Sequence, residues 1–195
     1  MPRLVVFSWP YGLFFWAVTL WAFGPEFQII SRQSEPLTSP QDAGSKRLIA
    51  AGQGLAGVAA FAIAATVPSA TLPHRIWWFW TGLGGIIAGS LLRRHCWRML
   101  GANFTGVVIV RPDQIVVDRG AYRYVRHPSY TAGAMMFLGI GLALANWISL
   151  AVLFAAIAIG YGYRVDVEER ALAGVIGDPY RRYMSRTKRF VPYLF

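Results

Sequence analysis

The chain has 195 residues, of which 55% are hydrophobic and only 14% are charged, and its formal net charge is +10. Soluble domains carry about 25% charged residues, so the composition is typical of a membrane protein and not of a soluble domain. The basic residues lie beside apolar segments and are not spread along a polar surface, which argues against a nucleic-acid-binding protein. A single cysteine, Cys96, excludes an internal disulfide and a multi-cysteine metal site.

Apolar segments recur along the whole chain, each close to the ~20 residues that a membrane-crossing helix needs. No Ala-x-Ala-like cleavage site follows the first of them, so we expect the N-terminus to be retained. The sequence therefore predicts an all-α integral membrane protein with about five transmembrane helices. The predicted spans are residues 4–23, 48–67, 76–92, 130–145 and 147–163.

The distribution of Lys and Arg predicts how these spans are oriented. With five spans, the basic residues of segments 24–47, 93–126 and 164–195 all fall on one side of the membrane. Only Arg3 and Arg75 remain on the other side. Since basic loops stay in the cytoplasm, we expect a multi-pass protein with a cytoplasmic C-terminus.

Three features of the N-terminal half favour structural roles. Segment 24–45 is rich in Pro, Ser and Gln and is interpreted as an exposed connection. Gly85 and Gly89 allow close approach of another helix, and their surface could also take a partner chain, so the oligomeric state is left open. The aromatic run at 76–80 is typical of an interfacial belt. We expect residues 1–92 to form three spans of a single membrane domain.

Residues 93–195 are predicted to form the functional core of that domain. Segment 101–117 is β-branched, interrupted by proline and too polar to cross lipid, so it predicts an ordered loop or short strands. The tail after Arg164 begins as a helix, breaks at 177–179 and resumes as a basic aromatic helix before Pro192. Asn146 separates the last two spans, which predicts a tight helical hairpin between them.

The stretch 118–133 (DRGAYRYVRHPSYTAG) lies where these elements meet. Pro128 is suited to the first turn of a helix, whose early N–H groups have no internal partner. Those groups, beside Arg123, Arg126 and His127, would suit a carboxylate or phosphate. The alternative is that the basic residues only mark a membrane boundary.

Arg164 and Glu168 are four residues apart and so share one face of a helix where it leaves the membrane. They form either a simple ion pair or a site in which Arg164 meets an acidic substrate and Glu168 binds hydroxyl or ammonium groups. Glu169 is expected to face elsewhere. Tyr180 and Tyr183, three residues apart, either pack in an interface or lie over a flat ring.

Several catalytic motifs are absent from the sequence: it has no GxSxG, no HExxH, no Walker loop and no GxGxxG after a strand. Its three histidines, His74, His95 and His127, have no metal-ligand spacing. No metal site is predicted.

RHPSY at 126–130, the hairpin, the Glu168–Glu169 pair and GDPYRRYMSRTKRFVP at 177–192 together resemble the isoprenylcysteine carboxyl methyltransferase family. This group of membrane methyltransferases also includes phospholipid N-methyltransferases. The resemblance covers about the last half of the chain, from Gly101 onward. It implies S-adenosylmethionine as cofactor, held in a cytoplasmic pocket formed by the loop before the fourth helix and the C-terminal helices.

The resemblance also implies roles for individual residues. Arg164 would position the carboxylate of a lipophilic, prenylcysteine-type acceptor taken from membrane lipid. Amine and thiol acceptors stay open, and these would need a proton acceptor such as His127 or Glu168. The rival interpretations are an NADPH-dependent sterol or steroid reductase and a non-catalytic membrane protein. The implied cofactor-binding residues are Gln114, Ile115, Val116, Val117, Tyr122, His127, Pro128, Ser129, Tyr130 and Glu168.

Overall fold

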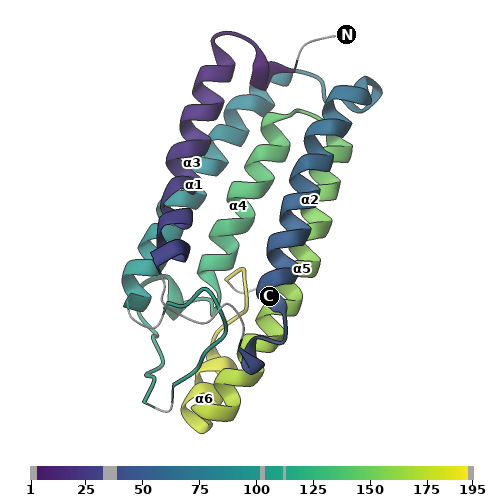
Figure 1. The fold of residues 1–195 in the computed structure, drawn as a ribbon. Helices are drawn as coiled ribbons and strands as arrows, with labels where there is room; N and C mark the ends of the chain where they lie inside the picture. The colour runs from purple at the N-terminus through teal and green to yellow at the C-terminus, as the bar shows by residue number, and fades with distance from the viewer. Residues whose placement is uncertain (1–3, 33–38, 102–103, 112, 193–195) are drawn as a thin grey trace.

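The computed structural model describes residues 4–32, 39–101, 104–111 and 113–192, and this part of the chain is helical with connecting loops. Long helices run alternately up and down, so that the N-terminal end and the end carrying α6 are opposite (Figure 1). The helices are α1 (Tyr11–Arg32), α2 (Ser45–Thr66), α3 (Arg75–Leu100), α4 (Pro128–Ala143), α5 (Trp147–Val175) and α6 (Asp178–Arg186).

The first predicted span was displaced along the chain. Residues before α1 form a 3-10 turn (η1, Val5–Phe7), and the helix begins at Tyr11, directly after Pro10. It then runs through Pro25 to Arg32, where the sequence predicted an exposed connection. Proline removes one helical hydrogen bond, but the next residue, Glu26, pairs with Arg93 of α3 at 2.6 Å and ties this turn to the bundle.

The remainder of that predicted connection is only partly described. Residues 33–38 lie outside the described residues, so the prediction of an exposed connection is not tested there. Beyond them a 3-10 turn, η2 (Pro40–Asp42), is capped by the Ser39 side chain and leads into α2. Asp42 in this turn is buried, so this part of the connection is not fully exposed to solvent.

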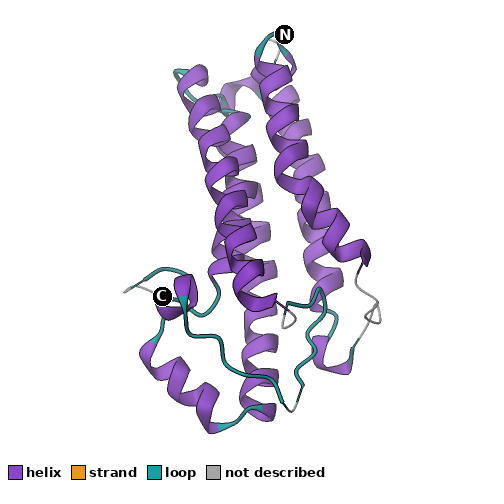
Figure 2. Cartoon of the chain, turned by 90° about the vertical axis from the view of Figure 1, so that its left-hand side faces the viewer, coloured by secondary structure: helices purple, strands orange, loops and turns teal. Residues whose placement is uncertain are grey.

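The alternative of short strands in segment 101–117 was wrong for the described residues, which form a loop ending in a 3-10 turn, η5 (Gly120–Arg123). The N–H groups of Val108 and Val110 bond to side chains of η2 and do not pair with a neighbouring strand. Figure 2 shows this loop and α6 at the same end of the molecule, beside the lower part of α5.

The hairpin between the last two long helices was predicted correctly. Asn146 caps α5 by accepting a hydrogen bond from the Ser149 N–H at 3.0 Å. Its side-chain amide also donates to the Val67 carbonyl at 3.1 Å, which ties the hairpin to the end of α2. The break in the tail falls at Gly177, where φ is 72°, a conformation that favours glycine.

Helices α3 and α4 approach each other at glycines. A Cβ added to Gly139 would lie 2.7 Å from the Gly82 carbonyl oxygen, and one added to Gly89 would lie 2.7 Å from the Ala132 carbonyl oxygen. The surface of Gly85 and Gly89 therefore faces α4 of the same chain, and is not free for a partner chain as the sequence allowed.

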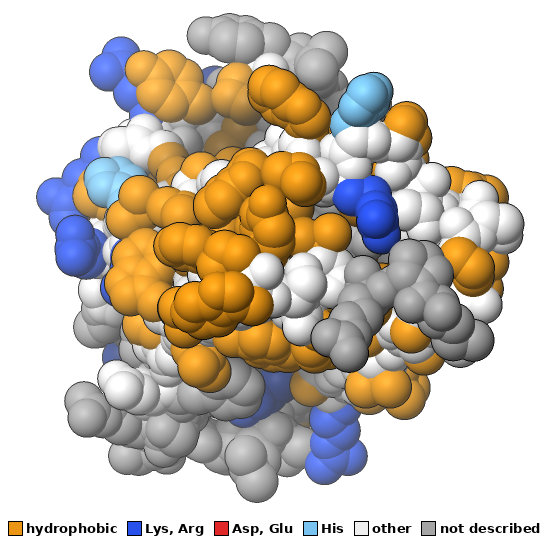
Figure 3. Space-filling model, turned by 90° about the horizontal axis from the view of Figure 1, so that it is seen from above, with side chains coloured by type: hydrophobic (Ala, Val, Ile, Leu, Met, Phe, Trp, Pro, Cys, Tyr) orange, Lys and Arg blue, Asp and Glu red, His pale blue; other side chains and the backbone are white. Residues whose placement is uncertain are grey.

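The core of the bundle is apolar, and so is much of its outer surface. Phe15, Phe79, Ile86, Met136 and Leu153 are fully buried between the helices. Seen from the N-terminal end, the molecule is covered mainly by hydrophobic side chains, with basic groups toward the edge (Figure 3). Two of the described helices, α2 and α5, are long and apolar enough to cross a membrane by length and composition.

Candidate active site

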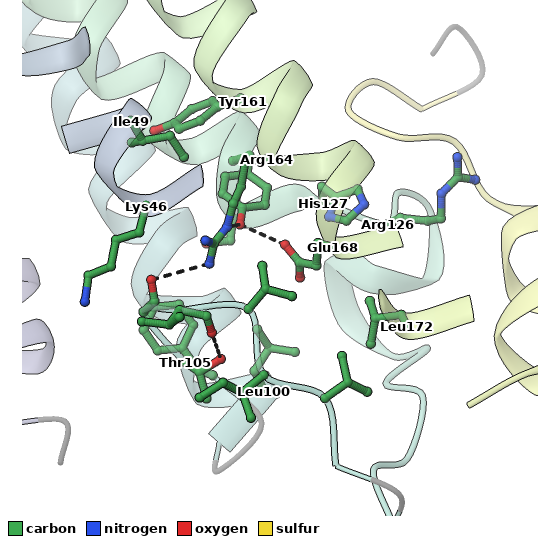
Figure 4. Close-up of a pocket in the computed structure, with 18 of the residues that line it drawn as sticks. Lys46, Ile49, Leu100, Thr105, Arg126, His127, Tyr161, Arg164, Glu168 and Leu172 are labelled. Atoms are coloured by element: carbon green, nitrogen blue, oxygen red, sulfur yellow. Dashed lines mark hydrogen bonds between the residues drawn. The ribbon is translucent and has the colours of Figure 1, made fainter. Parts of the chain in front are cut away.

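A cavity of about 510 Å³ lies at the end of the bundle opposite the N-terminus. Its walls come from α1 to α6 and from loop 104–117, so segments far apart in sequence meet around it (Figure 4). Pockets for small ligands and cofactors usually measure about 300–1,000 Å³. The cavity is thus large enough for an organic cofactor and part of a second molecule.

All but one of the predicted cofactor- and substrate-binding residues line this cavity. Pro128 is the exception, because it is fully buried as the first residue of α4 and helps to fix the start of that helix. Ile115 lines the cavity yet is 78% exposed, so the cavity is open to solvent along the loop. The predicted residues found in the lining are Gln114, Ile115, Val116, Val117, Tyr122, His127, Ser129, Tyr130, Arg164 and Glu168.

Arg164 is buried and forms no direct ion pair with Glu168 in the described part of the chain. Its Nη1 binds the Asp42 carboxylate, and its Nε donates to the Tyr130 hydroxyl at 3.0 Å. That hydroxyl in turn donates to Glu168 at 2.8 Å. Arg164 and Glu168 are therefore linked not by a simple ion pair but by two hydrogen bonds through the Tyr130 hydroxyl.

Asp42 was not recognised from the sequence, which placed it in a connection without function. Its carboxylate accepts hydrogen bonds from the N–H groups of Val108 at 3.0 Å and Lys46 at 3.1 Å, and from the Ser45 hydroxyl. Burial would raise the pKa of Asp42, but these two N–H groups and the Arg164 guanidinium outweigh it and hold the pKa below its usual range. Asp42 is therefore an anion at neutral pH, next to Arg164.

Glu169 does point away from Glu168, but it is a central residue of the site and not a surface one. Its buried carboxylate accepts from Arg126 Nε at 2.8 Å and from Arg189 Nη2 at 2.8 Å, and lies 3.2 Å from His127 Nε2. A charge taken out of water needs such partners. Neighbouring glutamates on α5 thus have different surroundings, since Glu168 borders the cavity and Glu169 is enclosed.

The C-terminal segment after α6 is held against the start of α4. The backbone N–H groups of Arg126 and His127 donate to the carbonyls of Lys188 at 2.7 Å and Arg189 at 3.0 Å. The Thr131 hydroxyl donates to the Phe190 carbonyl at 2.8 Å. Interpreting Arg126 as a simple membrane-boundary marker was therefore incomplete, because it fastens the tail over the site.

A second polar group was missed. Arg93 of α3 pairs with Glu26 of α1, and its Nη1 donates to the Ser129 carbonyl at 2.8 Å. Both charged residues line the cavity. From the sequence, Arg93 contributed only to the predicted topology and Glu26 was placed in a connection, although a charge at the edge of an apolar helix usually has a partner or a function.

Aromatic side chains complete the walls on both sides. Phe23, Phe137 and Tyr161 of the long helices line the cavity, and so do Tyr180 and Tyr183 of α6. The Tyr183 hydroxyl donates to the Tyr122 carbonyl at 2.6 Å, which fixes α6 to η5. The rings of the two α6 tyrosines have centroids 5.9 Å apart.

The described donor groups suit an organic ligand better than a metal ion. Among the residues described, no cluster of three His, Cys, Asp or Glu side chains could hold a metal. The Tyr122 hydroxyl is buried at the cavity and has no hydrogen-bond partner within the described residues. Burial raises the pKa of Tyr122, so its hydroxyl is protonated and can donate to a ligand.

Fold and site together define a class of protein: a helical bundle with an apolar exterior and a charged, aromatic-lined cavity at one end. Comparison with known proteins shows which family the chain is similar to. The model of the isoprenylcysteine carboxyl methyltransferase (ICMT) family matches residues 80–174. Through this region the chain is similar to that family.

Curated relatives show the same similarity. The chain is 32% identical over 122 residues to protein-S-isoprenylcysteine O-methyltransferase B of Arabidopsis thaliana, covering 60% of this chain and 61% of the relative. It is 28% identical over 116 residues to the Schizosaccharomyces pombe protein-S-isoprenylcysteine O-methyltransferase, covering 58% and 49%. The chain thus spans about half the length of the curated relatives that it matches.

The fold is similar to that of the eukaryotic intramembrane Ras methyltransferase ICMT. The TM-score is 0.69 at 21% sequence identity, over 98% of this chain and 72% of that one. At this identity the likeness concerns the fold. It covers the N-terminal helices as well, for which the sequence alone gave no resemblance.

Proposed function

We propose that this protein is a membrane methyltransferase that transfers a methyl group from S-adenosylmethionine to the carboxylate of a lipophilic, prenylcysteine-type acceptor. The proposal rests on one observation: many of the residues that line the cavity lie within the segment matched by the family model. The matched segment supplies Arg93, Tyr122, Tyr130, Arg164 and Glu168 to the cavity wall. The curated relatives bear the name protein-S-isoprenylcysteine O-methyltransferase.

The cavity fits the cofactor in charge as well as in size. Glu168 borders the cavity and forms no direct ion pair in the described part of the chain, and its carboxylate would bind the cofactor's ammonium group. Tyr122 offers a hydrogen-bond donor. Backbone and side chains of 114–117 and 127–130 would hold the rest, with α6 closing over them. When bound, the cofactor supplies a methyl group already activated on a sulfonium.

This chemistry needs little more than positioning from the protein. A carboxylate is ionised at neutral pH, so no general base is required. Bringing the two reactants together in the right geometry accelerates such a reaction by restricting their motion, and a dry cavity removes competing water. In the proposal, Arg164 orients the acceptor carboxylate while Tyr130 keeps the guanidinium in place.

The pairing of Arg164 with Asp42 limits how that carboxylate is bound. The guanidinium Nη1 is occupied by Asp42 and Ser45, and its Nε by Tyr130. Within the described residues, its Nη2 has only a long contact of 3.4 Å, to the carbonyl of Gly106, a residue that lines the cavity. The acceptor carboxylate is proposed to bind at Nη2 while Asp42 stays in place.

The proposal includes a membrane topology. We infer that α1 to α5 are transmembrane helices of one domain, with the cavity and the C-terminus in the cytoplasm. Support comes from the exposed apolar residues on the outer faces, such as Leu20, Leu55, Trp77 and Phe154. Membrane lipid would cover these faces. The prenyl chain of the acceptor would enter between the helices, toward Phe23 and Phe137.

The rival functions are less well supported. A reductase of the sterol or steroid type would need a phosphate-binding cluster for NADPH, whereas the cations of the cavity wall are largely engaged: Arg93, Arg126 and Arg164 each pair with a carboxylate. A non-catalytic protein would have no need to keep three buried or partly buried ion pairs around a cavity, since removing a charge from water is costly even when it is paired.

The proposal is tested by methyl transfer from labelled S-adenosylmethionine to N-acetyl-S-farnesylcysteine, using the purified full chain in detergent. We expect label in a product that releases methanol in alkali, as a methyl ester does. Label that is stable to alkali would indicate an amine or thiol acceptor. No transfer to carboxylate, amine or thiol compounds by folded protein would contradict the proposed function.

A further inference from the structure

The turn that precedes α2 is bonded to the loop that lines the cavity. Gln41 Oε1 accepts from the Val110 N–H at 2.9 Å, and Asp42 Oδ1 accepts from the Val108 N–H at 3.0 Å. Successive η2 residues thus bind alternate N–H groups of the loop. The loop position depends on η2, although the two segments are more than sixty residues apart in sequence.

Asp42 also binds Arg164, so η2 contacts the candidate substrate-binding arginine as well as the loop. The same Oδ1 that accepts from Val108 is the partner of Arg164 Nη1. Ser45 donates to this oxygen at 3.1 Å and accepts from Arg164 at 2.8 Å. One carboxylate oxygen therefore joins η2, the cofactor-side loop and α5.

The burial of these groups gives the arrangement little freedom. Asp42 is 3% exposed and Arg164 is 5% exposed, so neither charge can turn toward water without disrupting its neighbours. A shift of loop residue Val108 would move or release the Asp42 carboxylate, and a shift of Asp42 would release the guanidinium. Arg164 Nε is at the same time bonded to Tyr130, which reaches Glu168.

We propose that Asp42 is a positioning residue that couples the two binding events of the cavity, by holding Arg164 and loop 104–117 in one arrangement. The inference rests on the proposed function. Binding of the cofactor against the loop fixes Val108 and through it Asp42, which presents Arg164 to the acceptor carboxylate. By thermodynamic linkage, binding of the acceptor strengthens cofactor binding by the same factor.

The test measures this factor by calorimetry on the full chain in detergent. S-adenosylhomocysteine and N-acetyl-S-farnesylcysteine are titrated separately and then each in the presence of the other. In the unmodified protein we expect each ligand to strengthen the other about tenfold, within the usual range for coupled sites. In Asp42→Asn, both ligands bind more weakly and the factor falls to about one.

Two further variants separate coupling from a general loss of structure. Val108→Pro removes the N–H donor of the loop but keeps both charges, so it should also abolish the coupling, even if Asp42→Asn does not fold. Gln41→Ala removes the bond to Val110 and nothing from Arg164. It should weaken S-adenosylhomocysteine binding, leave acceptor binding alone unchanged and retain the coupling.

Each outcome decides between the interpretations. Coupling that persists in Asp42→Asn or in Val108→Pro would overturn the positioning role, and so would independent binding of the two ligands to the unmodified protein. If the unmodified, folded protein binds no S-adenosylhomocysteine, the proposed function itself fails, and this inference fails with it.

Discussion

The half of the bundle near the N-terminus and the half near α6 are built on different principles. In the first, α3 and α4 touch at backbone atoms, as at Gly82 and Gly139, and the side chains around them are apolar. In the second, the helices stand around a cavity and are held by ion pairs such as Arg164 with Asp42 and Arg126 with Glu169. The close-packed half keeps the helices in register, and the charged half presents functional groups to a ligand.

The comparison predicts that the largest loss of stability follows from a small change in the close-packed half. Gly139→Ala would place a Cβ 2.7 Å from the Gly82 carbonyl oxygen, which is backbone and cannot turn aside. We expect a loss of about 3 kcal/mol or more, at the upper end for overpacking, measured as the free energy of unfolding or as loss of folded protein.

The matched control is Gly57→Ala, in the middle of α2, where an added Cβ meets nothing within 4 Å. This change should be neutral or stabilise by up to about 1 kcal/mol, because alanine favours helix more than glycine does. Equal effects of the two substitutions would contradict the close contact of α3 and α4.

In the charged half, Glu169→Gln should have the next largest effect. The change leaves Arg126, His127 and Arg189 around a neutral group, and breaking a buried pair in this way costs about 3–5 kcal/mol. We expect a lower melting temperature and faster proteolysis of the segment after α6. Asp166→Asn is the control, since its pair with Arg189 is half exposed; a loss as large as that of Glu169→Gln would argue against a central role for Glu169.

Tyr130→Phe should affect binding more than folding. The ring stays in place, but Arg164 Nε and Glu168 lose the hydroxyl that joins them. Removing one partner of a buried polar group costs about 1–3 kcal/mol. We expect S-adenosylhomocysteine to bind about tenfold more weakly by calorimetry. The control is Tyr163→Phe, which removes an exposed hydroxyl whose one bond among the described residues is to the Ala43 carbonyl; this variant should bind as the unmodified protein does.

Arg181→Ala should have the smallest effect. Its pair with Asp178 on α6 is 3.3 Å long, and both side chains are mostly exposed. Pairs of this kind contribute about 0.2–1 kcal/mol. Thermal unfolding and cofactor affinity should both stay close to those of the unmodified protein, and a marked loss of either would mean that exposed charges of α6 matter as much as the buried ones.

The sequence was informative wherever the determining interactions are local. Hydrophobic segments predicted the long helices, Pro128 predicted the start of α4, and Asn146 predicted the hairpin. The first helix was misplaced because its apolar segment does not show that Pro10 delays the start or that α1 continues beyond Pro25. Tertiary contacts such as that of Glu26 with Arg93 decide such boundaries.

The candidate site was predicted only in part, for the same reason. Residues in recognisable motifs, such as His127, Tyr130 and Glu168, were found, and the structure places them at the cavity. Asp42 was missed because its partners, Val108 and Arg164, lie 66 and 122 residues away. Glu169 was correctly expected to face away from Glu168, but its partners were missed, because the sequence does not show that a later segment encloses that face of the helix.

The most direct test of the account is calorimetric titration of the detergent-purified protein with S-adenosylhomocysteine, next to a Glu168→Ala variant shown to be folded. Glu168 is bonded only through Tyr130 among the described contacts, so the variant should fold while losing the carboxylate that faces the cavity. We expect saturable binding to the unmodified protein and a loss of at least about tenfold in the variant. Absence of binding to the unmodified protein, or equal binding to both proteins, would contradict it.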